Sequence, residues 1–210
     1  MRILKCKNSL DKESIAAIEQ AAKDIRDGHL VVYPTETVYG IGANPFDQVA
    51  IKKLFVAKKR PFDMALSVAV CDKDMVEQIA IMSRPVEKLI DAFLPGPLTI
   101  ITDKNPNVPD MVTAMSHKVG IRIPDNKVAL ELIKRTGPLV ATSANLHSHP
   151  DATTVEEAQR DFGESVATYL DDGTTGTGRP STIVWISEGK VEIIRQGDIS
   201  KKQIEDALYA

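Results

Sequence analysis

Cysteine and long apolar segments are both scarce in this chain. Cys6 and Cys71 are its two cysteines among 210 residues, too few for a disulfide scaffold or a four-thiolate zinc site. No apolar run approaches the roughly 20 residues that a membrane-spanning helix requires. The first residues, Met1 to Lys5, lack the apolar segment and small-residue cleavage site of a signal peptide. These absences predict a cytoplasmic protein with no membrane attachment.

The chain also lacks a strong charge of either sign. Its 26 Lys and Arg residues against 29 Asp and Glu leave a formal net charge of −3. This balance excludes a globally basic nucleic-acid coat protein, although a local basic patch remains open. A chain of this length buries roughly 70% of its unfolded surface on folding. We therefore expect one domain over residues 1–210, with two small domains as the alternative.

Apolar residues at helical spacing alternate with β-branched runs along the chain. This pattern predicts an α/β domain with a largely buried, mixed sheet. Asp47, Thr154 with Glu157, and Ser200 with Gln203 each have the composition of a helix N-cap. We expect helices over 15–25, 47–58, 73–82, 85–94 and 126–136 and after residues 154 and 200, and strands over 30–33, 65–70, 98–102, 119–123, 139–142, 166–170, 182–186 and 191–195.

Several cations stand where an open α/β sheet binds ligands. Lys58 and Arg60 fall where a helix gives way to Pro61, and such junctions line the crevice beyond strand ends. Arg122 lies within a short strand and points to the face opposite its apolar neighbours. A charge in such a place usually has an anionic partner, either a protein carboxylate or a ligand. Arg195 ends another strand. Together these residues indicate a site for a polyanionic small molecule.

Other candidate motifs carry less chemistry. The glycine-rich stretch 173–179 has no Gly-Lys-Ser/Thr and precedes a strand, so it is neither a P-loop nor a dinucleotide fingerprint. It is either a passive mobile connector or a lid over a site. Ser143 lacks the context of a hydrolase nucleophile. We interpret His147 and His149 as ordinary loop residues.

Seven short motifs occur in order along the chain: Pro34–Gly42, Lys58–Pro61 (K-x-R), Pro95–Thr99 (P-G-P-x-T), Gly120–Pro124 (R-x-P), Ser143–Asn145 (S-x-N), Pro180–Ile183 (P-S-T) and Ile194–Gly197 (R-x-G). Together they resemble the motifs of the YrdC/Sua5/TsaC family. The resemblance implies a YrdC-like twisted mixed sheet with flanking helices and a deep basic cavity. It also implies a nucleotidyltransferase, L-threonylcarbamoyladenylate synthase, which joins L-threonine, bicarbonate and ATP into threonylcarbamoyl-AMP and pyrophosphate for tRNA t6A37 modification.

The same resemblance implies a role for individual residues. The catalytic group is Lys58, Arg60, Ser143 and Asn145; the ATP contacts are these four with Lys118 and Arg195; and the threonine contacts are Thr37, Arg122, Ser181 and the backbone of Ala141. Mg²⁺ is expected to arrive on the ATP phosphates, with no protein metal ligand assigned. Downstream threonylcarbamoyl-transferase proteins are the expected partners.

Two departures from the family pattern bear on the site. Residues 64–69 replace a common Asn-Pro-Leu-Ile-x-His segment, and Ser148 replaces the glycine of S-A-N-x-S-G.

The length matches the short form without the Sua5 C-terminal domain. YciO-type relatives lack S-x-N, so Ser143 and Asn145 favour the synthase. The alternative is a non-catalytic module that binds double-stranded RNA or tRNA, which the net charge disfavours.

Overall fold

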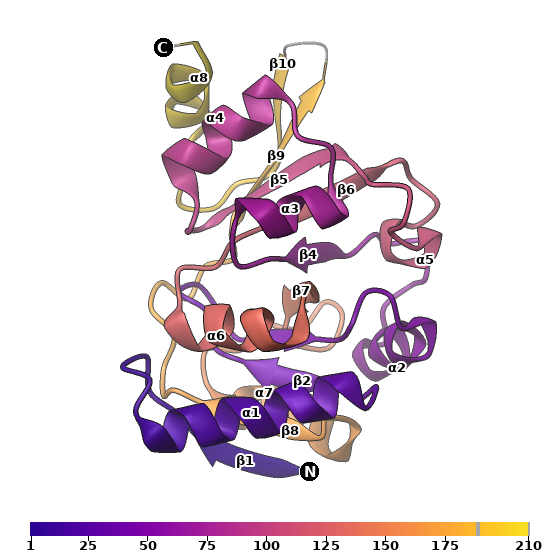
Figure 1. Cartoon of the computed structure of the whole chain (residues 1–210), viewed down its shortest axis with the longest axis vertical. Coiled ribbons are helices and arrows are strands. Elements are labelled where there is room, and N and C mark those ends of the chain that lie inside the picture. The colour runs from indigo at the N-terminus through magenta and orange to yellow at the C-terminus, as the bar shows by residue number, and fades with distance from the viewer. Residues whose placement is uncertain (188–189, 210) are drawn as a thin grey trace.

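The computed structural model describes residues 1–187 and 190–209 (Figure 1). Helices and strands alternate along most of the chain, as the pattern of apolar residues predicts. The strands are β1 (Arg2–Lys5), β2 (Val31–Tyr33), β3 (Gly40–Gly42), β4 (Ser67–Ala69), β5 (Leu98–Asp103), β6 (Lys118–Arg122), β7 (Leu139–Ser143), β8 (Thr168–Asp171), β9 (Thr182–Ser187) and β10 (Lys190–Arg195). The helices are α1 (Lys12–Arg26), α2 (Gln48–Lys58), α3 (Lys73–Ile79), α4 (Arg84–Phe93), α5 (Asp110–Thr113), α6 (Lys127–Thr136), α7 (Val155–Phe162) and α8 (Lys201–Tyr209), with a 3₁₀ turn at Gly163–Ser165.

The ten strands of the described residues form one mixed sheet. Their order is β1-β8-β2-β3-β7-β4-β6-β5-β9-β10. The sheet contains both parallel pairs, such as β4 with β6, and antiparallel pairs, such as β4 with β7. The predicted fold class, an α/β fold with a mixed sheet and flanking helices, is confirmed at this level.

The two faces of the sheet bury different sets of side chains, because successive residues of a strand point to opposite faces. Val32, Val68 and Val140 belong to the larger core, which also takes in side chains of α2, α4 and α7. Their neighbours in the same strands belong to a second core formed with α1 and α6. Those two helices lie side by side in front of the sheet (Figure 1).

Strand β3 escapes prediction because its sequence is Gly-Ile-Gly, which has low strand propensity. The glycines are needed for packing. The ring of Tyr33 covers them so closely that a Cβ on Gly40 or Gly42 would lie 3.1 or 3.0 Å from a ring atom. The sequence pattern also misses β1, which is exposed, and α5, which has four residues.

The predicted helix caps are present. Asp47 accepts hydrogen bonds from the backbone amides of Val49 and Ala50. Thr154 and Glu157 form a reciprocal capping box, and Ser200 and Gln203 exchange the same pair of bonds. Both cysteines are free. Among the described residues, no helix combines the length and apolarity needed to cross a membrane.

The cap at Asp47 gives a test of the start of α2. Asp47→Ala should lower the free energy of unfolding by about 1 kcal/mol, because two backbone amides lose their acceptor. Urea denaturation measures the change, and Gln48→Ala, at an exposed position of the same turn, is the control. Equal stability of the two variants would contradict the cap.

Candidate functional site

A polar cavity of about 190 Å³ opens on the sheet face that α1 and α6 share. Tyr33, Ser67, Arg122 and Ala141 come from four different strands and line it. Ser67 and Ala141 alternate with residues of the larger core, so they stand on the opposite face. The complete lining is Tyr33, Thr35, Val38, Tyr39, Gly40, Arg60, Ala65, Leu66, Ser67, Thr99, Arg122, Ala141, Thr142, Ser143, Pro180, Ser181, Ile183 and Arg195.

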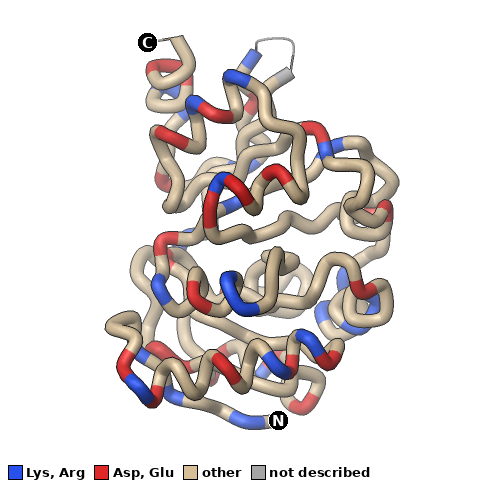
Figure 2. The backbone as a smooth tube through the Cα atoms, viewed as in Figure 1, with Lys and Arg blue, Asp and Glu red and all other residues tan. Residues whose placement is uncertain are grey.

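The lining contains three arginines and no carboxylate side chain. Arg60, Arg122 and Arg195 come from the end of α2, from β6 and from β10. In contrast, Lys and Arg alternate with Asp and Glu along the outer helices (Figure 2). The positive charge of the cavity is therefore local, as the sequence pattern predicts, and it suits an anionic ligand.

Arg122 forms an ion pair with a carboxylate of the protein. Its Nη2 atom donates to Glu36 Oε1 at 2.7 Å and to Thr37 Oγ1 at 2.8 Å. Both side chains are mostly buried, with 12% and 17% of the arginine and glutamate side chains exposed. Glu36 Oε2 and Arg122 Nε are buried and make no hydrogen bond to the described residues. The sequence analysis assigns no role to Glu36.

The segment that holds Glu36 and Thr37 is a tight polar turn. Thr35 Oγ1 donates to the carbonyl of Val38 at 2.6 Å and lies 2.9 Å from Thr37 Oγ1. The Tyr39 hydroxyl donates to the Gly173 carbonyl at 2.7 Å. The burial raises the pKa of Tyr39 well above its usual range. These bonds fix the segment between β2 and the glycine-rich stretch.

The glycine-rich stretch docks on that segment. Thr177 and Gly178 donate their amides to the carbonyls of Glu36 and Thr37, at 3.2 and 3.0 Å, and Thr175 donates to Thr153 at 2.9 Å. A Cβ on Gly176 would lie 2.9 Å from the Glu36 carbonyl oxygen. The stretch therefore packs against the cavity wall and leads into β9, the strand predicted after it.

Ser181 and Arg195 meet at the wall formed by β5, β9 and β10. Arg195 donates from Nε to the Ser181 carbonyl at 3.0 Å and from Nη2 to its hydroxyl at 3.2 Å. The same hydroxyl lies 2.8 Å from Thr99 Oγ1. Desolvation lowers the pKa of Arg195, an effect that nearby Asp151 opposes. The P-S-T and R-x-G segments thus come together.

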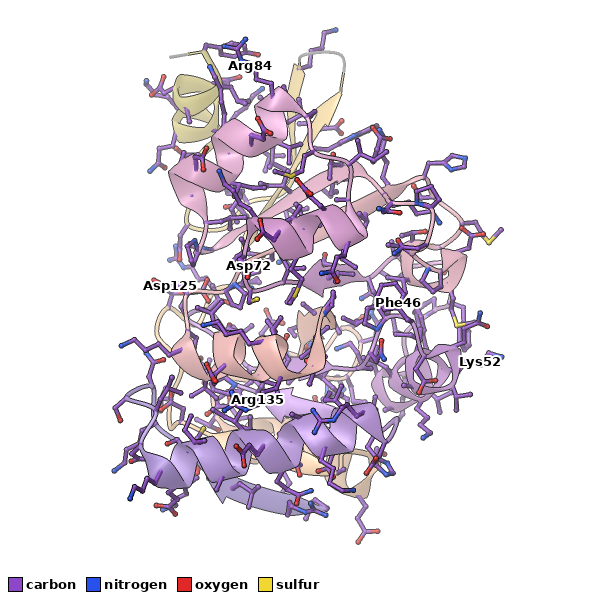
Figure 3. All side chains as sticks on the ribbon, viewed as in Figure 1. Phe46, Lys52, Asp72, Arg84, Asp125 and Arg135 are labelled. Carbon is purple, nitrogen blue, oxygen red and sulfur yellow. The ribbon has the colours of Figure 1, made fainter. Side chains whose placement is uncertain are left out.

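Lys58 and Arg60 point to different places. The chain leaves α2 through Lys59, which has a left-handed backbone with φ of 51°. Arg60 turns to the cavity and donates to the carbonyl of Ala65 at 2.8 Å. Desolvation lowers its pKa. Lys52, on the outer face of α2, is exposed (Figure 3).

Lys58 is buried beneath the S-x-N loop, with 2% of its surface exposed. Its Nζ donates to the carbonyls of Ser143 and Asn145 at 2.5 and 2.6 Å. Burial, with a smaller contribution from the charge of Arg60, lowers the pKa of Lys58 to about 7. The neutral amine keeps two N–H donors, so both bonds survive loss of the proton.

The S-x-N loop is also held by its own side chains. Ser143 Oγ donates to Asn145 Oδ1 at 2.5 Å, and Asn145 Nδ2 donates to the carbonyls of Leu146 and His149. Ser148, which replaces the family glycine, has a left-handed backbone with φ of 67°. The backbone path that a glycine would favour is therefore retained by a serine.

Comparison with known proteins agrees with this geometry. Residues 23–197 match the model of the Sua5/YciO/YrdC family, described as telomere recombination. The chain belongs to the Sua5/YciO/YrdC family. A putative threonylcarbamoyl-AMP synthase of Methanocaldococcus jannaschii is 38% identical over 198 residues, covering 94% of each chain. The threonylcarbamoyl-AMP synthase of Bacillus subtilis is 39% identical over 194 residues, covering 91% of this chain and 56% of the relative.

Solved structures of Sua5/YciO/YrdC proteins match along the whole sheet. The crystal structure of Pyrococcus abyssi Sua5 complexed with L-threonine is 33% identical, with a TM-score of 0.93. The match covers 99% of this chain and 61% of that one, so this chain spans little more than half the length of the longer relatives. Escherichia coli YciO, at 21% identity and a TM-score of 0.86, shares the fold.

The site residues implied by the Sua5/YciO/YrdC motifs fall into three groups. Arg60, Arg122, Ala141, Ser143, Ser181 and Arg195 line the cavity. Thr37, Lys58 and Asn145 lie behind its wall and hold lining residues in place. Lys118 is not among the lining residues, and its Nζ pairs with Asp103 at 2.7 Å.

Six polar lining residues have no role assigned from the sequence: Tyr33, Thr35, Tyr39, Ser67, Thr99 and Thr142. The pattern misses Tyr33 because an aromatic residue in a buried strand is usually core. Thr35, Tyr39 and Thr99 lie in segments that carry the family resemblance, which implies no role for them. Strand alternation was a usable signal for Ser67, since its apolar neighbours predict that it faces the other side.

The buried Lys58 amine predicts both a stability loss and a pH dependence. Lys58→Met should lower the free energy of unfolding by about 2–4 kcal/mol, because two buried carbonyls lose their donor.

The pH dependence follows from the lowered pKa of Lys58. The pKa of Lys58 is about 7 in the folded protein and near 10.4 in the unfolded chain. Between these two values the unfolded chain binds more protons than the folded protein, so the free energy of unfolding rises with pH. The loss caused by Lys58→Met should therefore grow with pH, by at most about 1.4 kcal/mol per unit. Urea titrations at pH 7 and 9.5 measure it. Lys53→Met, which removes one bond to Gly28, is the control, and a pH-independent loss would refute the buried neutral amine.

Proposed function

We infer that this chain is a threonylcarbamoyl-AMP synthase serving tRNA t6A modification, and that its reaction takes place in the arginine-lined cavity. Family membership and relatives at 38–39% identity support the activity. The observation that carries the location is the convergence of Arg60, Arg122 and Arg195 on a cavity without a carboxylate in its lining. Such a lining suits substrates that each carry an anionic group: the ATP phosphates, bicarbonate and the carboxylate of threonine.

The proposed reaction has two steps. The amine of L-threonine takes up bicarbonate with loss of water and becomes a carbamate. A carbamate oxygen then attacks the α-phosphorus of ATP, and the bond to the leaving pyrophosphate breaks. Transfer of this kind requires positioning and charge neutralisation more than a covalent nucleophile. A cavity with three guanidinium groups and no catalytic triad fits that requirement.

We propose distinct roles for the residues around the nucleotide. Arg60, Arg195 and Ser143 contact the ATP phosphates. Lys58 and Asn145 act by holding Ser143 in place, since both bond to it from behind the cavity wall. Lys118 stays a proposed ATP contact outside the cavity lining, and its exposed ion pair with Asp103 is weak enough to exchange for a phosphate.

For threonine, we propose that Arg122 receives the carboxylate. A planar guanidinium matches a planar carboxylate, and Thr37, Ser181 and the Ala141 backbone lie beside it or in the same lining. The related P. abyssi Sua5 has been crystallised with L-threonine, which supports an amino-acid site in this fold.

Mg²⁺ enters this proposal as part of the ATP substrate. The described residues contain no group of three His, Cys, Asp or Glu side chains that would hold a metal ion. We propose that the ion is carried on the phosphates, where it would neutralise their charge. We also propose that residues 1–210 act as one domain, supported by the unbroken order of strands from β1 to β10.

The activity is tested by a three-substrate assay. Pyrophosphate release should require L-threonine, ATP and bicarbonate together, because the carbamate is the attacking group, and mass spectrometry should detect threonylcarbamoyl-AMP. Omission of each substrate in turn is the control. Pyrophosphate release without threonine would contradict the synthase. Binding of double-stranded RNA without turnover would favour the RNA-binding alternative.

The nucleotide contacts are tested by Arg60→Ala. Loss of a charge-assisted contact should weaken ATP binding by about 1.5–3 kcal/mol, measured by calorimetry. Lys52→Ala removes an exposed charge from α2, the helix that precedes Arg60, and serves as the control. Equal ATP affinity in both variants would rule out Arg60 as a phosphate contact.

The threonine contact is tested by Arg122→Lys. Because lysine cannot form the two-pronged contact, the threonine requirement should rise far more than the ATP requirement in steady-state kinetics. If Arg122 serves only its ion pair with Glu36, the variant should instead lose thermal stability and keep its threonine dependence.

A further inference from the structure

Arg122 and Glu36 are joined by one hydrogen bond, whereas a guanidinium and a carboxylate can form two. One contact joins Nη2 to Oε1, and the remaining hydrogen on Nη2 goes to Thr37. The described residues contain three buried side-chain polar atoms without a partner: Glu36 Oε2, Arg122 Nε and Trp185 Nε1. Two of the three therefore belong to this one pair, in which Arg122 lines the cavity and Glu36 lies directly behind it.

Such an arrangement has a free-energy cost that a ligand can remove. Buried polar atoms are almost always hydrogen-bonded, and each exception calls for an explanation. The two unpaired atoms differ in kind, because Arg122 Nε is a hydrogen-bond donor and Glu36 Oε2 is an acceptor. The backbone carbonyl of Glu36 also accepts from the amide of Thr177, which anchors the residue to the docked glycine-rich stretch.

An α-amino acid has groups complementary to both open positions. Its carboxylate accepts from a guanidinium, and its ammonium donates to a carboxylate. The cavity lining supplies no carboxylate for that ammonium, whereas Glu36 is bonded directly to the lining residue Arg122. Asp151 is the other acidic residue whose charge acts on a cavity arginine, Arg195, and no hydrogen bond of the described residues joins the two.

We propose that Glu36 binds the ammonium group of the substrate through Oε2 and makes the site specific for amino-acid zwitterions. The proposal rests on the proposed function, in which threonine occupies the side of the cavity formed by Arg122. It adds a substrate-binding residue that selects by charge: an α-hydroxy acid satisfies Arg122 and leaves Glu36 without a donor. The site should reject an α-hydroxy acid because the Glu36 carboxylate would stay buried without a hydrogen-bond donor, which costs free energy.

Binding measurements without ATP separate the two ends of the substrate. Three ligands are compared by calorimetry: L-threonine, L-threoninamide, which lacks the carboxylate, and 2,3-dihydroxybutanoate, which lacks the amine. Glu36→Gln keeps an oxygen for Arg122 and removes the charge. The variant should bind L-threonine and L-threoninamide about 10- to 100-fold more weakly, as expected for a lost hydrogen bond to a charged group. Its affinity for 2,3-dihydroxybutanoate should not fall.

Two variants control for the loss of a carboxylate. Asp24→Asn neutralises a buried carboxylate that pairs with Arg2 away from the cavity, and Asp151→Asn tests the competing acidic residue. Both should bind the three ligands as the wild type does. Selective weakening of the two amine ligands by Asp151→Asn would overturn the assignment to Glu36.

A structural role for Glu36 predicts a different outcome. If Glu36 only orients Arg122, Glu36→Gln should weaken L-threonine and 2,3-dihydroxybutanoate equally, and this result would overturn the proposal. Absence of L-threonine binding to the wild type would instead refute the proposed function. If the variant does not fold, the carboxyl ¹³C resonance of Glu36 in the wild type decides: it should shift with L-threonine and L-threoninamide and not with 2,3-dihydroxybutanoate.

Discussion

The cavity depends on one buried amine. Lys58 Nζ joins the last residue of α2 to the carbonyls of Ser143 and Asn145, at the end of β7. Because the amine is inside the protein, its charge is disfavoured and its hydrogen bonds are strong. The contact places the Ser143 hydroxyl and, through the left-handed turn at Lys59, directs Arg60 to the cavity. One lysine thus sets the positions of two cavity residues without being part of the lining.

The period of two along the strands explains why a polar cavity can exist in a sheet with two apolar cores. Ser67 lies beside Val68, and Ala141 beside Val140, so each strand buries one side chain and presents the next to the cavity. On this face α1 and α6 cover the ends of β2, β4 and β7 that carry Val31, Ala69 and Leu139. The cavity occupies the part of the same face that these helices leave uncovered.

The sequence predicted the periodic features well and the long-range contacts poorly. The helices, the caps at Asp47 and Thr154, and the direction of Arg122 follow from local spacing and capping chemistry. The burial of Lys58 does not, because its partners are the carbonyls of residues 85 and 87 positions away. The pairing of Lys118 with Asp103 escaped for the same reason, since register between strands determines it.

The charge on each arginine is held in place by oxygen atoms of the protein. Arg60 bonds to the Ala65 carbonyl, Arg195 to the Ser181 carbonyl, and Arg122 to Glu36. Two of these partners are neutral, so Arg60 and Arg195 keep a full net charge for an anion. Arg122 alone has a protein carboxylate, which cancels its net charge and leaves a dipole. A dipole favours a zwitterion over a simple anion, because the ammonium and the carboxylate of the zwitterion each meet the opposite charge. The cavity therefore separates a region suited to phosphates from one suited to an amino acid by the identity of the arginine partners.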